Sequence, residues 1–517
     1  MKRDWLLALV VVAGISTSQA AVAQTAPLDL IKQAVSAVGG TDALRNLKRI
    51  SIKANAEHRE PEQSYVADGE PRLTATSKLT ISWDLESALA RTEWDRSLVY
   101  PFPGPEKYSD VLTAKSGFTA TEKGERPMSS IRVAAERREL ERASPTLLLK
   151  ALAAPERLGV LKDQPFGADS LPAVTFDEGW TKFIILFDRQ THLPAAIRTI
   201  DDDNLLGDAI YDVVFTDWKP VAGVQIAHTQ TQRLAGVDVG KIVYTEVAPN
   251  PTLAAQTFEP SEAVRKDLKP AATANVPYQW VLRRITLARF IDSDAINYDA
   301  ASVPGLKLVE ITPNVQQVLG GSHNSLIVAT HDSLVVFDAP INEWQSHWTI
   351  AAAKKKYPGK PVKYLFLTHQ HNDHTGGVRT YVAEGATVIV GSPNKAYFEK
   401  VLAAPHTVNP DDLQKNPKPG SIIEVADQMT LGKGDDEIRF YRIANPHAEG
   451  MMIGYAVHDN VVWVTDLYSP TRDKAKSQGV IAFGQALKKY NIKPFMIAGG
   501  HGAMAPPAEL EGIMSKN

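Results

Sequence analysis

The sequence predicts two folding units of different class, a mainly antiparallel β-sheet domain with helices and then an α/β layered domain. The chain has 517 residues, more than one hydrophobic core ordinarily serves. Up to about residue 260, short stretches alternate apolar and polar residues, which is the pattern of half-buried strands. Beyond about residue 306, continuous apolar strands alternate with helical stretches, which indicates helices and strands stacked in layers.

The amino terminus has the composition of an export signal. Lys2 and Arg3 precede the apolar run WLLALVVVAGI, and small residues follow it up to AVA at 21–23. This pattern predicts a signal peptide over residues 1–23, cut after Ala23. Its apolar run is shorter than the roughly 20 residues of a membrane span, and no later segment is long and apolar enough. We therefore expect a periplasmic or secreted protein with no integral membrane segment after cleavage.

The overall composition is that of an ordinary globular protein. The net charge is −3 and 44% of the residues are hydrophobic, so the chain lacks the basic excess of a nucleic-acid-binding protein. It contains no cysteine, so its stability must come from core size and any bound metal rather than from disulfides. We therefore expect no nucleic-acid partner.

Residues 24–260 are predicted to form the β-rich domain. Apolar positions at helical spacing over 28–47, interrupted by Gly39 and Gly40, predict two short helices joined at the glycines. Alternating stretches then run from Ile50 to about residue 249, with a helical patch at about 131–157, and favour a twisted sheet curling around one or two helices. This order, with GVQI following DWKPVA, resembles the half-barrel of lipoprotein carriers.

Residues 261–305 are predicted to be a connector, and residues 306–517 the α/β domain. Its strands are apolar runs such as SLIVAT, VKYLFLT, NVVWVTD and KPFMIAGG. Helical stretches lie between them near 343–357, 376–384, 394–404 and 477–490. At about 210 residues, this unit is large enough to hold a core of its own.

The stretch THQHNDHTGG, directly after the strand VKYLFLT, crowds four ligating side chains into six positions. His369 and His371 are two residues apart, so on an extended loop they can point to the same side. Asp373 and His374 follow at the turn into a helix and cannot easily join the same metal. One loop therefore offers part of the ligand set to each of two adjacent metals.

Further ligands stand at the ends of other predicted strands. His447 follows RFYRIANP, Asp466 ends NVVWVTD, and His501 ends FMIAGGH. One predicted site is His369, His371 and His447. The other is Asp373, His374 and His501, with Asp466 placed to bridge both metals through its two oxygens.

These residues, together with Asp338 in VVFDAP, resemble the metallo-β-lactamase superfamily of metal-dependent hydrolases over about 306–517. The resemblance implies an αββα sandwich with the metals at one rim of the sheets. It also implies that Asp338 supports the ligand loops without binding metal. Imidazole and carboxylate ligands suit two zinc ions per chain, although manganese or iron would fit the same set.

The implied mechanism is attack by a hydroxide that bridges the two metals. Asp373 is expected to orient this hydroxide, and Tyr468, two residues past Asp466, is a candidate for the acid that protonates the leaving group. His323 in GGSHNSLIV is near enough to a strand start to line the site, but we interpret it as a loop-stabilising residue. His406 lies on a proline-flanked loop that could cover the site.

The expected substrate is a small ester or lactone met outside the cytoplasm. Export argues against the branches of the superfamily with intracellular substrates. The absence of cysteine, and the presence of Asp466, count against the β-lactamase branches. An ester needs little acid assistance, which suits a site with no obvious proton donor. The alternatives are a β-lactam or sulfate-ester hydrolase, a single-iron dioxygenase of sulfur compounds, and a non-enzymatic envelope protein that binds or carries lipid.

Overall fold

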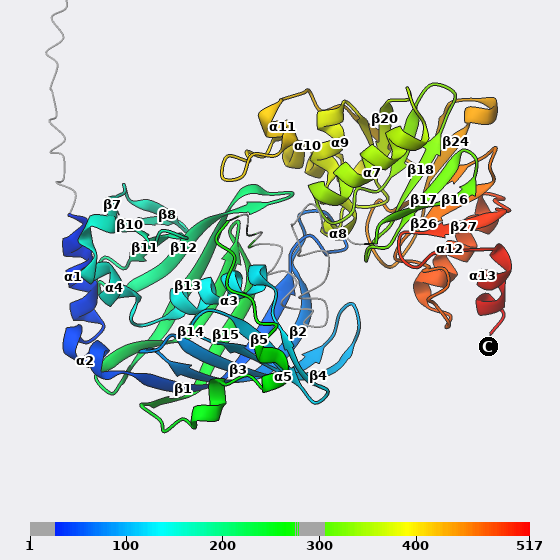
Figure 1. The fold of residues 1–517 in the computed structure, drawn as a ribbon. Helices are drawn as coiled ribbons and strands as arrows, with labels where there is room; N and C mark the ends of the chain where they lie inside the picture. Colours follow the sequence, from blue (N-terminus) through cyan, green and yellow to red (C-terminus); the bar gives the residue numbers. More distant parts are fainter. Residues whose placement is uncertain (1–25, 275, 277, 279–304, 517) are drawn as a thin grey trace, which may run out of the picture.

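The computed structural model describes residues 26–274, 276, 278 and 305–516. The signal peptide predicted over residues 1–23 lies outside these described residues, as does most of the second half of the predicted connector. A large curved sheet and a layered α/β unit lie beside each other (Figure 1). Among the described residues, no helix combines the length and the apolar character needed to cross a membrane. The structure therefore confirms the two classes of architecture that the sequence predicts.

The amino-terminal half is built on one sheet of thirteen strands, and its order is β6-β5-β4-β3-β2-β1-β15-β14-β13-β12-β11-β10-β7. Neighbouring strands pair antiparallel throughout. The strands are β1 Arg49–Glu60, β2 Arg72–Asp84, β3 Leu89–Leu98, β4 Gly104–Leu112, β5 Gly117–Thr121, β6 Gly124–Pro127, β7 Leu158–Val160, β10 Ala173–Asp177, β11 Lys182–Phe187, β12 Pro194–Asp203, β13 Gly207–Val221, β14 Val224–Leu234 and β15 Val237–Pro249. A small separate ribbon pairs β8 Gln164–Phe166 with β9 Asp169–Leu171.

Four helices share a hydrophobic core with this sheet. They are α1 Pro27–Ala37, α2 Gly40–Asn46, α3 Ser130–Ala143 and α4 Leu147–Ala153. The predicted glycine joint lies between α1 and α2, where Gly39 has a φ of +119° and a Cβ would lie 2.1 Å from the carbonyl oxygen of Gly223. A side chain at position 39 would therefore be both strained and blocked.

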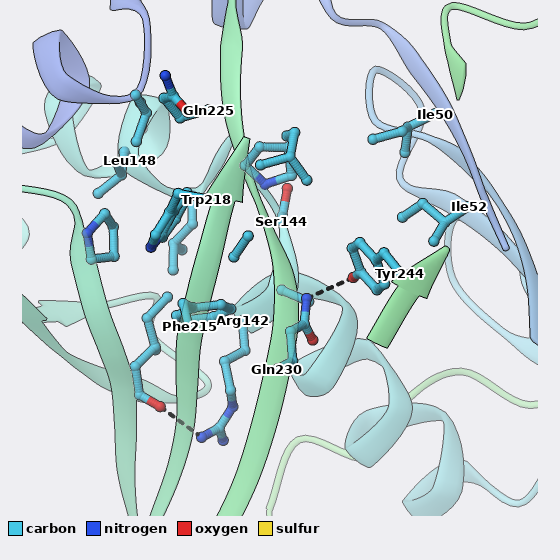
Figure 2. Close-up of a pocket in the computed structure, with 18 of the residues that line it drawn as sticks. Ile50, Ile52, Arg142, Ser144, Leu148, Phe215, Trp218, Gln225, Gln230 and Tyr244 are labelled. Carbon is cyan, nitrogen blue, oxygen red and sulfur yellow. Dashed lines mark hydrogen bonds between the residues drawn. The ribbon is translucent and has the colours of Figure 1, made fainter. Parts of the chain in front are cut away.

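The concave part of this half contains an apolar cavity of about 60 Å³ (Figure 2). Its lining includes Ile50, Ile52, Phe215 and Trp218. Gln230, which also lines it, donates to the hydroxyl of Tyr244 at 2.6 Å, as Figure 2 shows. A neighbouring cavity of about 200 Å³ shares some of these residues. This half therefore encloses apolar space of its own.

The carboxyl-terminal half contains two sheets, one of seven strands in the order β16 to β22 and one of six in the order β23 to β28. The first comprises β16 Lys307–Thr312, β17 Val315–Leu319, β18 Ser325–Ala329, β19 Leu334–Phe337, β20 Val362–Phe366, β21 Thr387–Gly391 and β22 Ile422–Val425. The second comprises β23 Gln428–Leu431, β24 Ile438–Arg442, β25 Met452–Ala456, β26 Val461–Val464, β27 Met496–Gly499 and β28 Met504–Ala505. The helices are α7 Glu343–Lys356, α8 Asn372–Thr375, α9 Val378–Glu384, α10 Lys395–Ala403, α11 Asp412–Lys415, α12 Gln478–Lys489 and α13 Pro507–Met514.

The packing of these elements makes four layers. Between the sheets lies a core in which the rings of Phe366 and Phe440 stack with centroids 4.6 Å apart. A second cluster packs the first sheet against α7, α9 and α10, and a third packs the second sheet against α12 and α13. The order is helices, sheet, sheet, helices, so the αββα sandwich implied by the resemblance is confirmed.

The predicted boundary between the halves stays a prediction. A short 3₁₀ turn (Ala255–Phe258) and helix α5 (Glu262–Arg265) follow the last strand of the large sheet. Phe258 and Val264 pack with Val111 and Phe118 of that sheet. The first described residues of the predicted connector thus contact the amino-terminal half.

Candidate metal centre

The ligand loop begins where strand β20 ends. β20 is an interior strand of the first sheet, which is parallel from β19 to β22, so the loop lies at the edge where carboxyl ends gather. His371 caps the amino terminus of α8 in an extended conformation, with φ −60° and ψ 140°. Because the chain is extended up to this residue and helical after it, the predicted division of the loop into two ligand pairs is possible.

The structure brings His369, His371 and His447 together as a first set. Their potential ligand atoms all lie within 4.8 Å of one another. Nδ1 of His371 lies 2.9 Å from Nε2 of His447, and the rings of His369 and His371 meet edge to face with centroids 4.4 Å apart. Three imidazoles with converging nitrogens are a common zinc ligand set.

Burial keeps the first set neutral. Burial, reinforced by the neighbouring His447, lowers the pKa of His371 to about 3. Burial also lowers the pKa of His369 well below its usual value, and lowers that of His447. Nε2 of His369 is buried, lies 3.3 Å from a carboxylate oxygen of Asp466, and has no hydrogen-bond partner. An imidazole lone pair without a proton or partner is what a metal ion requires.

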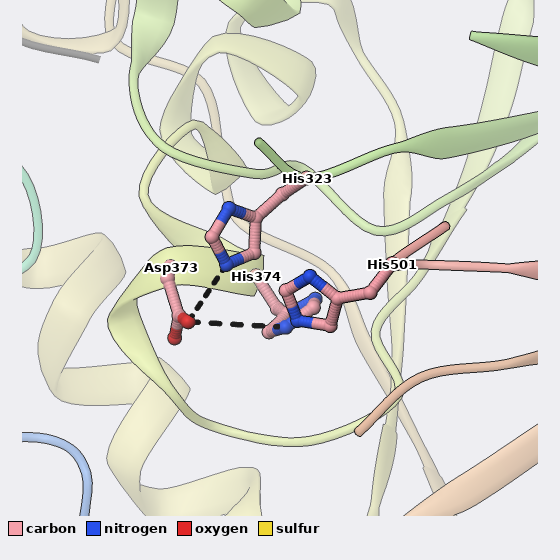
Figure 3. A group of neighbouring side chains, drawn as sticks. All are labelled: His323, Asp373, His374 and His501. Atoms are coloured by element: carbon pink, nitrogen blue, oxygen red, sulfur yellow. Dashed lines mark hydrogen bonds and ion pairs between the residues drawn. The ribbon is translucent and has the colours of Figure 1, made fainter. Parts of the chain in front are cut away.

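A second set contains Asp373, His374 and His501, and also His323 (Figure 3). His323 lies among these residues, and its Nε2 is 2.9 Å from Oδ2 of Asp373. All four offer ligand atoms within 4.8 Å of one another. The interpretation of His323 as a loop-stabilising residue was therefore incomplete, because its ring lies within the cluster.

Asp466 lies between the two sets. Its Oδ1 is 2.8 Å from Nε2 of His501, and its Oδ2 is 3.0 Å from Nε2 of His374. The same Oδ2 is 3.3 Å from Nε2 of His369 and 3.5 Å from Nε2 of His447. One carboxylate thus faces histidines of both sets, the first set through Oδ2 alone and the second through both oxygens.

The second set is charged where the first is neutral. Burial opposes a charge on His374, but the carboxylates of Asp466 and Asp373 outweigh it and raise its pKa well above the usual value. Burial likewise opposes ionisation of Asp373 and Asp466, yet the adjacent histidines hold the pKa of both well below the usual range. Without metal, a protonated His374 lies between two carboxylates.

Asp338 lies behind the ligand loop. Its side chain is fully buried. Its Oδ1 accepts from the backbone N–H of Thr368 at 2.8 Å, and its Oδ2 accepts from the indole N–H of Trp463 at 3.1 Å. Thr368 immediately precedes His369, so Asp338 fixes the start of the ligand loop.

Two other candidates have partners outside the cluster. Tyr468 is fully buried, its hydroxyl donates to Glu509 at 2.8 Å, and its ring stacks on Phe483. It therefore packs in the core beneath α12 and α13, and the structure does not support the acid role suggested by its place in the sequence. His406 is buried with its Nδ1 3.5 Å from Asp202, and it does not line the metal-ligand cluster.

The loop of residues 61–71, between β1 and β2, reaches the ligand loop from the other half of the molecule. The Gln63 amide donates to Oδ1 of Asp373 at 2.6 Å, and accepts from the hydroxyl of Tyr100 at 3.0 Å. Nε2 of His371 donates to the carbonyl of Ser64 at 2.9 Å, which leaves its Nδ1 as the nitrogen facing His447. No sequence pattern pointed to Gln63 or Ser64, because each is an ordinary polar residue about 300 positions from its partner in the ligand loop.

Comparison with known proteins agrees with this architecture. Residues 318–466 match the family profile of the metallo-beta-lactamase superfamily. The carboxyl-terminal domain belongs to this superfamily. The match includes seven of the eight residues of the two sets and the bridge, from His323 to Asp466, and leaves out His501.

Individual relatives of this metallo-β-lactamase domain match over short segments. An alkyl/aryl-sulfatase of Saccharomyces cerevisiae is 35% identical over 78 residues, and a linear primary-alkylsulfatase of a Pseudomonas species is 36% identical over 78 residues. Each match covers 15% of this chain and 12% of the relative. A solved metallo-beta-lactamase from Pontibacter korlensis is 18% identical, with a TM-score of 0.32, and the match covers 41% of this chain and 97% of that one.

Proposed function

We propose that the protein is an exported hydrolase that holds two zinc ions and cleaves a small ester or lactone. The observation that carries this proposal is the position of Asp466, whose two oxygens face histidines of both sets within 3.5 Å. In this proposal His369, His371 and His447 would hold one ion, Asp373, His374 and His501 would hold the other, and Asp466 would contribute its carboxylate to both. Two such ions would lower the pKa of a water molecule and polarise the scissile bond.

The residues of the chain supply orientation and charge. Ser64 fixes the tautomer of His371, so that Nδ1 remains free toward the cluster. Gln63 occupies Oδ1 of Asp373, so that Oδ2 is the oxygen facing His323 and His374. A carboxylate held in this way can orient a nucleophile by accepting a proton from it.

The chemistry of the leaving group favours an ester over an amide. Tyr468 is directed to Glu509, and the hydroxyl of Tyr100 donates to Gln63. Neither tyrosine is therefore placed to give a proton to a leaving group. An alkoxide or phenoxide leaves with less acid assistance than an amide nitrogen, so carboxylic esters and lactones are the proposed substrates.

A sulfate ester is the second candidate. The names of the two curated relatives, an alkyl/aryl-sulfatase and a linear primary-alkylsulfatase, favour this class. The match covers only 12% of each relative, so a sulfate-ester substrate is a proposal for this chain. Export is proposed from the sequence of residues 1–23.

The test combines metal analysis with a substrate panel on the purified full chain. We expect two zinc ions per chain, and chelator-sensitive hydrolysis of p-nitrophenyl butyrate or a γ-lactone faster than that of p-nitrophenyl sulfate, a penicillin or a carbapenem. Fastest turnover of the sulfate would transfer the proposal to the second candidate. Protein that contains one iron and no zinc would instead support the single-iron dioxygenase and contradict the proposed hydrolase.

A further inference from the structure

His323 is held so that one particular nitrogen faces the cluster. Its Nδ1 lies 2.9 Å from the hydroxyl of Ser322, and its Nε2 lies 2.9 Å from Oδ2 of Asp373 (Figure 3). Only 5% of the residue is exposed. Its ring lies edge-on to those of His374 and His501, with centroids 4.9 and 4.4 Å apart. The side chain is therefore packed among metal-ligating residues rather than lying over them.

The segment that carries His323 is tied to the segment that carries His501. The backbone N–H of Asn324 donates to the carbonyl of Gly500 at 2.8 Å, and its side-chain amide donates to the carbonyl of Gly502 at 2.7 Å. Nδ1 of His501 lies 3.3 Å from the carbonyl of Ser322, which leaves its Nε2 toward Asp466. The carbonyl of His323 accepts from Gln345 at 2.8 Å. The two histidines are thus fixed relative to each other by several bonds.

We infer that His323 is itself a metal ligand, through Nε2, at the position held by Asp373, His374 and His501. This inference rests on the proposed two-metal centre and extends it by one residue. All four ligand atoms lie within 4.8 Å of one another, so the four side chains form one group that could hold a metal ion. The hydrogen bond between His323 and Asp373 is then the metal-free substitute for two bonds to one ion.

The consequence is an unequal pair of metal positions. The first set supplies three imidazoles and shares Asp466, whereas the second supplies three imidazoles and a carboxylate and shares Asp466. Four protein donors suit the low coordination number that zinc prefers. Five donors favour a metal that accepts five or six ligands, so the second position is the one at which manganese or iron would compete with zinc.

The competing explanation is that His323 only holds Asp373 in place. Removing a residue that orients a ligand typically costs about 10–100-fold in metal affinity. Removing a ligand costs more, and the lost nitrogen can be replaced by free imidazole. A glutamine at this position could still donate to Asp373 through its amide, so it would preserve an orienting role and abolish an imidazole ligand.

The experiment compares the wild-type chain with His323→Ala and His323→Gln, and uses His458→Ala as the matched control. His458 is in the same domain, its side chain is 50% exposed, and it pairs with Asp435 outside the cluster. Bound zinc is measured by elemental analysis after dialysis, and affinity by competition with a chelator. Circular dichroism and the melting temperature of each metal-free variant verify that it is folded.

We expect both His323 variants to keep one zinc and to bind the second more than about 100-fold more weakly than the wild type, with the affinity restored by imidazole in His323→Ala. The control should bind two. The inference is overturned if His323→Gln binds both ions within 100-fold of the wild-type affinity. Wild-type protein that binds fewer than two metals would instead overturn the two-metal proposal, so the two failures are distinguishable.

Discussion

The two ligand sets lie side by side but solve the problem of burying charge in opposite ways. The first set contains only imidazoles, and burial keeps their pKa values low. The second set pairs carboxylates with histidines, and the ionised aspartates raise the pKa of His374. In the metal-free protein the first set is therefore uncharged, whereas the second already holds a proton where a cation would bind.

This difference separates two requirements of a metal site. The first set needs only unprotonated imidazole nitrogens that face one another. Burial keeps these imidazoles neutral, and the Ser64 carbonyl accepts from Nε2 of His371, so that Nδ1 carries no proton. The second set must also release a proton when a metal binds. Four experiments test this difference between the two sets.

Asp466→Asn should have the largest effect, because this carboxylate serves both sets. An amide of nearly the same size keeps one oxygen but loses the charge that faces four histidines. We expect zinc to be lost from both positions and turnover to fall by more than about 100-fold, beyond the range for a residue that merely supports a ligand. Elemental analysis with steady-state kinetics measures both, and full zinc content in the variant would contradict the bridging role.

Asp338→Asn should act more mildly and on the ligand loop as a whole. The amide can still accept from Thr368, but one of its two acceptor positions becomes a donor that faces Trp463 or Thr368. We expect metal affinity to fall by about 10–100-fold. Chelator competition tests this, and an unchanged affinity would mean that the loop does not depend on Asp338.

The pH dependence of metal binding should differ between the sets. The pKa of His374 is raised in the metal-free protein, so at neutral pH metal must displace its proton, and affinity at the second position should rise by about tenfold per pH unit up to that pKa. The pKa values of the first set are lowered, so its affinity should stay level from pH 6 to 8. Calorimetric titration in buffers of different ionisation enthalpy counts the released protons. Equal proton release at both positions would erase the distinction.

Gln63→Leu should have the smallest effect of the four. The leucine removes the amide donor from Oδ1 of Asp373 at similar size, so the second position should weaken by about tenfold, at the low end of the range for supporting residues, while the first is unchanged. Tyr100→Phe provides the matched control, because it removes only the bond that holds Gln63. If both variants instead weaken metal binding at the first position, the prediction is contradicted, because the amino-terminal loop would then support the first ligand set.

Sequence reasoning found the residues that follow strands and failed on those that depend on distant packing. His369, Asp466 and His501 each follow an apolar run, and such runs can be recognised in a single sequence. His323 gave no such signal, because a single histidine before a strand has many uses. Tyr468 was judged by its distance along the chain from Asp466, yet the backbone turns between them and directs its hydroxyl to Glu509.

The amino-terminal half shows the same limit. Alternation of apolar and polar residues predicted its strands, and two glycines predicted the joint between α1 and α2. Nothing in GluGlnSer at 62–64 indicates that this loop docks on a histidine loop in the other half. Contacts between distant segments depend on how two finished surfaces meet, and local patterns do not record that.

The contact between Ser64 and His371 joins a segment that is synthesised early to one that is synthesised late. These residues are 307 positions apart, so at ordinary rates of chain growth the loop around Ser64 is made roughly 15–60 s before its partner. An amino-terminal sheet that folds as it is made would already present its carbonyl when the histidines emerge. A circularly permuted gene that places residues 306–517 first would reverse this order. The ligand loop would then be made before Ser64, the residue that fixes the tautomer of His371.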